Sequence, residues 1–210
     1  MLDKAILEKY LSICMSSEAD FAEIYEEEET NETISMLNGQ VDNINTVLVS
    51  GIGVRLYKGT QTVYAYSNET DDKAMMPLIK DLKEAIGDSG QKKEITLNRV
   101  TYESRHPVEK DFLKAVLEEK TELLKRANDA AFNYDERIVK VQTSLLNVRQ
   151  DVQISNSEGK LIGDTRVRTR MMCSAYAEKD GNLQSGGDRP GAGKGLEFYD
   201  EHTPEDIGRE

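Results

Sequence analysis

The fold is decided by residues 20–67, DFAEIYEEEETNETISMLNGQVDNINTVLVSGIGVRLYKGTQTVYAYS. The apolar residues of this stretch recur at every second position: Ala22 and Ile24, Ile34 and Met36, Val47 and Val49, Val54 and Leu56, Val63 and Ala65. A period of two is typical of β-strands with one buried face. Asn38-Gly39 is a strong hairpin signal because a type I′ turn needs positive φ at both central positions, and Lys58-Gly59-Thr60 offers a second tight connection. The stretch therefore predicts consecutive hairpins in a largely antiparallel meander.

Gly51 and Gly53 flank Ile52 at the start of one of these strands. A glycine inside a strand usually marks a bulge or the close approach of another backbone. We expect a bulge here.

Two helices are predicted to cover this sheet. Apolar residues at helical spacing predict a short amphipathic helix over residues 3–16: Leu2, Ile6, Leu7, Leu11 and Cys14. Thr70 and Asp71 can cap a second helix that ends at Gly87, with Pro77 near its first turns. Its apolar side is formed by Met75, Leu78, Ile79, Leu82 and Ile86.

The second half of the chain repeats this organisation after a polar connection at residues 87–106. A helix is expected to begin at Pro107 or Val108 and to run to about Ala131. Strands are expected at Ile138–Leu146, Val148–Ser155 and Leu161–Ala177, the last two joined by the turn at residues 156–159. The glycine-rich residues 185–195 have no apolar period, and the last residues, EHTPEDIGRE, resemble the cap and first turn of a helix.

These elements predict an α+β fold of two small subdomains, each an antiparallel sheet of hairpins covered by one or two helices. We expect an N-terminal subdomain at residues 1–90 and a middle subdomain at residues 107–197. Residues 198–210 are then expected to be the start of a truncated C-terminal region.

The composition excludes several classes of protein. Lys and Arg total 27 against 39 Asp and Glu, a net charge of −12, and nucleic acid is therefore not an expected partner. No stretch approaches the roughly 18 apolar residues that a membrane span needs, and the N-terminus has no apolar signal segment. The two cysteines, Cys14 and Cys173, lie beside apolar residues. We expect a cytoplasmic protein with reduced thiols.

Several motifs that could hold a ligand do not meet the requirements of their chemistry. Residues 186–195, GGDRPGAGKG, lack the first glycine and the final hydroxyl of a Walker A loop, at Asp188 and Gly195. The consecutive Glu26–Glu29 cannot converge on one calcium ion from a strand, which favours a solvated, charged edge strand. His106 and His202 have no partner at metal-ligand spacing. We therefore name no catalytic and no metal-binding residue.

Arg166, Arg168 and Arg170 alternate with Val167, Thr169 and Met171, which places three guanidinium groups on one face of a strand. In one interpretation they form ion pairs with acidic residues on adjacent strands. In the other they form a surface that contacts a peptide carboxylate or an acidic partner.

Residues 20–75 resemble the start of the TldD/PmbA family. The resemblance lies in the Ala-Asp-Phe-Ala-Glu opening, in Gly-Ile-Gly-Val-Arg at residues 51–55 and in Ala-Tyr-Ser-Asn at residues 65–68. In the second half, Gly-Lys-Leu at 159–161, Asp-Thr-Arg at 164–166 and Gly-Leu-Glu-Phe at 195–198 resemble the middle region of TldD more than that of its sister subunit PmbA, also called TldE.

The resemblance implies a zinc metallopeptidase whose active subunit carries a His-Glu-x-x-x-His motif and a further cysteine ligand in a C-terminal domain. That motif is absent from residues 1–210, so the chain alone is expected to be inactive and zinc is expected only in the full-length enzyme. The resemblance further implies pairing with a TldE/PmbA-like subunit, or a homodimer, around a chamber that admits unfolded and leader peptides. This part would form the chamber wall as a scaffold. The alternative is a self-sufficient peptide-binding or regulatory module that associates with a TldE-like partner.

Overall fold

A computed structural model describes residues 1–91, 93–102, 104 and 106–210. The helices are α1 (Lys4–Cys14), α2 (Asp72–Ile86), α3 (Leu117–Phe132), α4 (Phe198–Glu201) and α5 (Pro204–Arg209). The strands are β1 (Phe21–Leu37), β2 (Gln40–Lys58), β3 (Gln61–Ser67), β4 (Asn98–Val100), β5 (Ile138–Asn156), β6 (Lys160–Lys179), β7 (Asn182–Asp188) and β8 (Gly191–Ala192). The predicted α+β class is confirmed.

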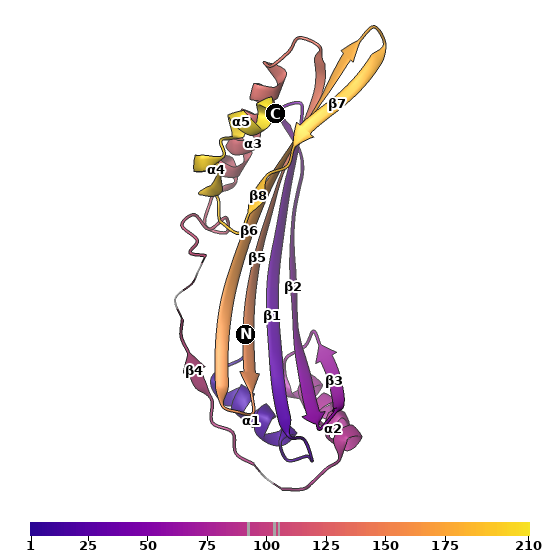
Figure 1. The fold of residues 1–210 in the computed structure, drawn as a ribbon, viewed down its shortest axis with the longest axis vertical. Helices are drawn as coiled ribbons and strands as arrows, with labels where there is room; N and C mark the ends of the chain where they lie inside the picture. Colours follow the sequence, from indigo (N-terminus) through magenta and orange to yellow (C-terminus); the bar gives the residue numbers. More distant parts are fainter. Residues whose placement is uncertain (92, 103, 105) are drawn as a thin grey trace. The chain divides into compact units, whose positions relative to one another are not determined.

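The strands pair in the order β3-β2-β1-β5-β6-β4, and β7 and β8 also pair with β6 (Figure 1). The pairs β2–β3, β6–β7 and β6–β8 are antiparallel, whereas β4 runs parallel to β6. The chain divides into two compact units, each built from three segments. The first unit comprises Met1–Glu29, Val49–Glu103 and Gln150–Thr165, and the second comprises Thr30–Leu48, Ser104–Arg149 and Arg166–Glu210. The four long strands β1, β2, β5 and β6 therefore contribute residues to both units.

The tight turns lie where the sequence predicts them. Asn38 and Gly39 between β1 and β2 have φ of 50° and 79°, as a type I′ turn requires. Gly59 between β2 and β3 has φ of 56°, and Gly159 between β5 and β6 has φ of 87°. Local turn chemistry thus sets these three connections.

The bulge predicted at Gly51 and Gly53 does not occur in the pairing of β2 with β3, which includes Gly53. Pairing between β2 and β3 continues without interruption from Ile52 opposite Ser67 to Lys58 opposite Gln61. A Cβ atom at Gly53 would lie only 2.7 Å from the hydroxyl oxygen of Tyr64. Gly53 therefore makes room for an aromatic side chain of the neighbouring strand.

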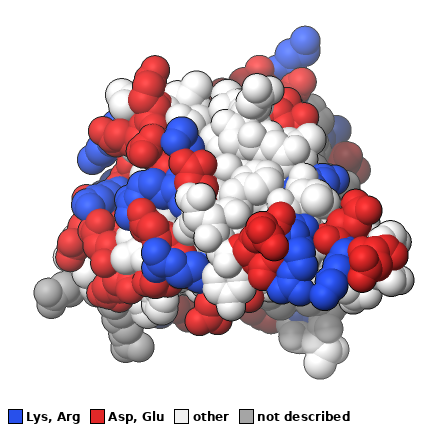
Figure 2. Space-filling model, turned by 90° about the horizontal axis from the view of Figure 1, so that it is seen from above, with Lys and Arg blue, Asp and Glu red and all other residues white. Residues whose placement is uncertain are grey.

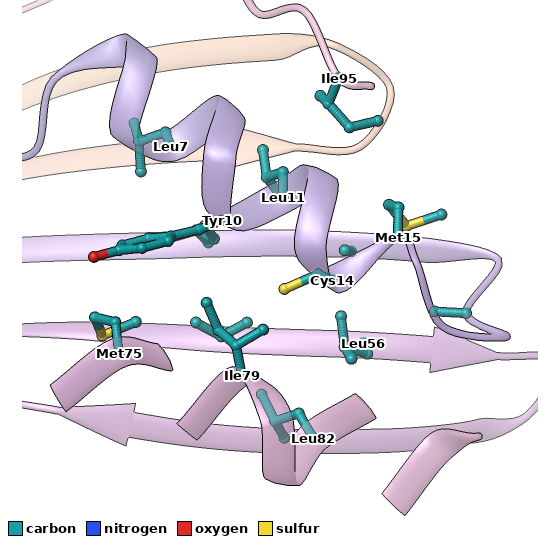
Figure 3. Packing of buried hydrophobic residues seen from close by; sticks show 14 of the residues in the cluster. Leu7, Tyr10, Leu11, Cys14, Met15, Leu56, Met75, Ile79, Leu82 and Ile95 are labelled. Atoms are coloured by element: carbon teal, nitrogen blue, oxygen red, sulfur yellow. The ribbon is translucent and has the colours of Figure 1, made fainter. Parts of the chain in front are cut away.

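The core of the first unit lies between its sheet and the two predicted helices (Figure 3). Leu7 and Leu11 of α1, Ile79 and Leu82 of α2 and Leu56 of β2 belong to one cluster of buried side chains. The side chain of Asp71 caps α2 by accepting a hydrogen bond from the Ala74 amide at 2.9 Å. The helix ends at Gly87, whose φ is 108°. Both helices predicted for this half are confirmed.

Strand β1 is not the solvated edge strand that its acidic run suggested, because it lies between β2 and β5. Glu26 is 3% exposed, and its carboxylate accepts hydrogen bonds from the Leu2 amide at 2.7 Å and the Gln153 side chain at 2.8 Å. The alternation of side chains along β1 places Glu26 on the buried face of the strand. The two neutral donors satisfy its carboxylate there.

The connection predicted at residues 87–106 contains buried residues and a short strand, which its polar sequence did not indicate. Ile95 and Leu97 are buried in the core of the first unit, and β4 follows them. The Ile95 amide donates to Ser12 and the Leu97 amide to Glu8, so side chains of α1 anchor this segment. Lys92, Glu103 and Arg105, which also belong to the predicted connection, lie outside the described residues.

In the second unit, α3 begins at Leu117 and not at Pro107 or Val108 as predicted. The residues before it are bound to a distant part of the chain. The Lys110 carbonyl accepts a hydrogen bond from the Leu196 amide at 2.8 Å, and the Lys110 amide donates to the Glu197 carboxylate at 2.9 Å. These contacts replace helical hydrogen bonds, although Phe112 is buried at the position that the helical period suggested.

The later strands are longer and more numerous than predicted. The strands expected at Ile138–Leu146 and Val148–Ser155 are one strand, β5, because Asn147 is buried within it and hydrogen-bonded. The glycine-rich residues contribute β7 and β8, which the lack of an apolar period concealed. The helix predicted at the end is α5, capped by Thr203.

Within the described residues no helix combines the length and the apolar character that crossing a bilayer requires.

Both cysteine thiols should react slowly in the folded protein. Burial raises the pKa of Cys14 to about 12 and the pKa of Cys173 to about 11, so little thiolate exists at pH 8. We expect a thiol-disulfide reagent at pH 8 to modify both at least about a hundredfold more slowly than in urea. Fast modification of the native chain would contradict this burial.

Candidate functional site

The three arginines of β6 lie as their alternation predicts. Arg166, Arg168 and Arg170 are exposed, whereas Val167 and Thr169 between them are buried. Arg168 and Arg170 form no ion pair with any residue of the described ranges 1–91, 93–102, 104 and 106–210. The interpretation that the arginines pair with acidic residues on adjacent strands therefore does not hold for Arg168 and Arg170 within the described residues.

Arg168 and Arg170 line a groove in the second unit, which we call the arginine groove. Its lining consists of Leu146, Val148, Arg168, Thr169, Arg170, Gly191, Ala192 and Gly193. One wall is β8, where Ala192 pairs with Thr169 and Gly191 with Arg170. A Cβ atom at Gly191 would lie 2.8 Å from the Thr169 carbonyl oxygen, so glycine allows this close approach. Two cations thus border a groove with an apolar floor.

A chain of buried polar groups, which we call the Glu32 network, lies on the inner side of the same strands. The Thr169 hydroxyl donates to the Asn147 side-chain oxygen at 2.7 Å, and the Asn147 amide donates to Glu32 at 3.0 Å. Lys120 Nζ lies 2.6 Å from the second Glu32 oxygen. Because the Thr169 proton is already used, the Tyr199 hydroxyl 2.9 Å away must be the donor to Thr169. The chain of hydrogen bonds from Tyr199 through Thr169 and Asn147 thus ends at the Glu32 carboxylate.

The Glu32 network joins five elements of the second unit: β1, α3, β5, β6 and α4. Its members are 1–9% exposed. Burial raises the pKa of Tyr199, which keeps its hydroxyl protonated as a donor. The network fixes β6 from its inner side and thereby the backbone that carries Arg168 and Arg170.

Glu197 holds the glycine-rich segment where it leaves the groove. Its carboxylate accepts hydrogen bonds from the backbone amides of Lys110 at 2.9 Å and Gly195 at 2.8 Å. Burial alone would raise the pKa of Glu197, but these amides outweigh it and lower the pKa. A Cβ atom at Gly195 would lie 2.3 Å from the Lys110 carbonyl oxygen, so only glycine fits this contact.

The residue types that could bind zinc are not gathered. No group of three or more His, Cys, Asp or Glu side chains is placed to hold a metal ion in the described part of the chain. The His202 ring stacks on Phe198 with 4.5 Å between ring centroids, and His106 is exposed. Cys14 and Cys173 are buried thiols. The described side chains therefore do not fit a zinc centre.

Sequence reasoning found the arginines but missed the Glu32 network. Two signals could have revealed it. Glu32 shares the inner face of its strand with Ile34 and Met36, and Lys120 shares the apolar stripe of its helix with Leu124. A glutamate and a lysine on apolar faces are each costly alone and together suggest a buried ion pair.

Charged side chains of both signs alternate over the face shown in Figure 2, beside an area without charged groups. No continuous basic surface is visible on this face.

Two solved structures have a fold similar to that of this chain. A proposed modulator of a DNA gyrase from Thermotoga maritima has a TM-score of 0.76 and 16% identity, over 98% of this chain and 46% of that one. TldE from Thermococcus kodakarensis has a TM-score of 0.67 and 14% identity, over 97% and 46%. At these identities the likeness concerns the fold alone.

The family follows from the sequence comparisons. Residues 22–89 match the model of PmbA/TldA metallopeptidase domain 1, and residues 110–210 match that of the PmbA/TldA metallopeptidase central domain. The chain belongs to the PmbA/TldD metallopeptidase family.

Two curated relatives are each a metalloprotease TldD homolog. The relative from Buchnera aphidicola (subspecies Acyrthosiphon pisum) is 28% identical over 183 residues, 85% of this chain. The relative from Haemophilus influenzae is 27% identical over 194 residues, 90% of this chain. The chain spans 37% and 39% of the lengths of these relatives.

Removing the cation of the Glu32 network should destabilise the second unit strongly. Lys120→Met leaves the Glu32 carboxylate buried without its partner, and we expect a loss of about 3–5 kcal/mol in the free energy of unfolding by urea. Lys125→Met on the same helix breaks only an exposed pair with Asp129 and should cost less than about 1 kcal/mol. Equal losses for the two variants would contradict the role given to Lys120.

Proposed function

We propose that residues 1–210 are a non-catalytic scaffold part of a TldD-type zinc metallopeptidase subunit that acts on unfolded or leader peptides. The observation that supports it is the match to domain 1 and the central domain of PmbA/TldA metallopeptidases over residues 22–89 and 110–210. The zinc ion and the catalytic residues would belong to a part of the enzyme outside these 210 residues. In the cytoplasm, where we place the protein, both cysteines would stay reduced.

The scaffold would form part of the wall of a peptide chamber, with a TldE/PmbA-like subunit or a second copy as its partner. The Thermococcus kodakarensis neighbour is itself named TldE, which supports a partner of the same fold. The arginine groove would contact a peptide carboxylate or an acidic segment of the partner. Guanidinium groups suit this role because they donate two parallel hydrogen bonds to one carboxylate.

The alternative, a peptide-binding module that works by strand addition, is favoured by one observation. Strand β2 pairs with β3 only from Ile52 to Lys58, and along Gln40–Leu48 its one strand partner in the described chain is β1. That edge exposes Val41, Ile44 and Leu48, and its only charge is Asp42. Edges without lysine or proline are suited to pairing with another extended chain.

Zinc content and peptidase activity distinguish the two functions. We expect the 210-residue chain to bind no stoichiometric zinc and to cleave no unfolded peptide, alone or mixed with a TldE-like subunit. Activity should appear only when the chain is joined to a TldD C-terminal region that carries the zinc motif. Zinc binding with cleavage by the chain alone would refute the scaffold function, and tight peptide binding without cleavage would favour the alternative.

The arginine groove can be tested with peptides that end in a free carboxylate or in an amide. We expect the chain to bind the free acid more tightly, and Arg168→Ala with Arg170→Ala to weaken that binding about tenfold by removing charge-assisted hydrogen bonds. Arg99→Ala, an exposed arginine of the first unit, is the control and should change nothing. Equal affinity for acid and amide would show that the groove does not recognise a carboxylate.

A further inference from the structure

The first unit carries a second groove that the proposed function does not use. It lies on the sheet face opposite to Val63 and Ala65, which pack against the core. Its lining includes Tyr25, Glu27, Gly51, Gly53, Tyr64 and Tyr66. We call it the tyrosine groove. Three aromatic rings, those of Tyr25, Tyr64 and Tyr66, thus line this groove.

The two tyrosines of β3 have different surroundings. The ring of Tyr64 lies against Gly53 and has the Arg55 guanidinium 5.2 Å from its centroid. Tyr66 stacks beside Tyr64, with 6.3 Å between ring centroids and 27° between planes. Tyr66 is 73% exposed, against 53% for Tyr64. No Lys or Arg of the described residues lies over the Tyr66 ring.

Packing explains Tyr64 but not Tyr66. An aromatic ring that covers a strand glycine stabilises the sheet, and Tyr64 does this for Gly53. Tyr66 faces Gly53 across the strand pair but buries little of its surface. An exposed, pre-positioned tyrosine beside a groove is the kind of side chain that proteins use for contact with a partner.

The chemistry of the groove selects a cation. The Arg55 guanidinium lies over the Tyr64 ring, where the Tyr57 hydroxyl at 3.2 Å and the Glu23 carboxylate at 3.4 Å also bind it. The face of a ring in this pair thus accommodates a guanidinium, as expected from the negative quadrupole of an aromatic ring. The Glu27 carboxylate also lines the groove, positioned by hydrogen bonds from the Tyr25 hydroxyl at 2.7 Å and the Gln150 amide at 2.9 Å. The net charge of −12 attracts cations to the whole chain.

The shape of the groove selects an extended chain. Gly51 contributes no side chain to the floor, and a Cβ atom there would touch the Ser67 carbonyl oxygen at 3.4 Å and the Asn68 side-chain oxygen at 3.6 Å. Ser67 and Asn68 add polar groups to the lining, where a peptide backbone needs hydrogen-bond partners.

We propose that the tyrosine groove binds an extended peptide segment through a basic side chain, preferably arginine, which lies flat on the Tyr66 ring. This surface differs from the arginine groove, and the proposal stands whether or not the chain belongs to a working peptidase. It implies that a ligand of this unit carries positive charge, in contrast to the carboxylate expected at the arginine groove.

The test uses the 210-residue chain and two capped pentapeptides, acetyl-Gly-Ala-Arg-Ala-Gly-amide and the same peptide with citrulline, the neutral isostere of arginine. Binding is followed by NMR through the ring resonances of the tyrosines. We expect the arginine peptide to bind at least about threefold more tightly and to shift the Tyr66 ring signals.

Three variants make the result specific. Tyr66→Leu keeps an apolar side chain without a ring and should abolish the preference for arginine, whereas Tyr66→Phe should retain it. Tyr134→Leu removes a tyrosine that is 67% exposed in the second unit and should leave binding unchanged. Equal affinity for arginine and citrulline, or an unchanged preference in Tyr66→Leu, would overturn the proposal. Failure of the zinc and peptidase experiment would leave it untouched.

Discussion

The second unit depends on one buried carboxylate, that of Glu32. A charge of this kind is tolerated away from water only when paired and hydrogen-bonded, and here Lys120 supplies the charge while Asn147 supplies the second donor. Glu32 lies on β1 and its partners come from α3 and β5, so the chain must bring three distant segments together before the carboxylate is satisfied. Thr169 and Tyr199 extend the same requirement to β6 and α4. Because every hydrogen bond of the network needs a specific partner, the network favours a single arrangement of these elements over alternatives with equal apolar burial.

Features governed by neighbouring residues could be predicted from the sequence. The alternation in β1 to β3, the turn at Asn38-Gly39 and the capped helix α2 depend on interactions within a few residues. The errors occur where a distant segment decides. The helix expected from Pro107 begins at Leu117, because residues 195–197 bind the backbone of Lys110. No local pattern reveals such a contact.

The candidate sites show the same division. Strand periodicity alone placed Arg166, Arg168 and Arg170 on one face, but only the fold puts residues 191–193 beside Arg168 and Arg170 as a groove wall. The glycines at 51 and 53 suggested a bulge. The sequence does not show that Tyr64, which covers Gly53, lies on the neighbouring strand. Residue type and spacing can therefore identify candidate side chains, while the shape of a site depends on which strands become neighbours.

The continuity of the four long strands constrains how the chain can be synthesised and divided. The first unit is complete only when residues 150–165 have joined residues 1–29 and 49–103. A nascent chain on the ribosome therefore cannot close this unit until residue 165 has emerged, although domains usually fold in order from the N-terminus. No single cut in the chain would release either unit whole, because the three segments of one unit alternate along the sequence with those of the other.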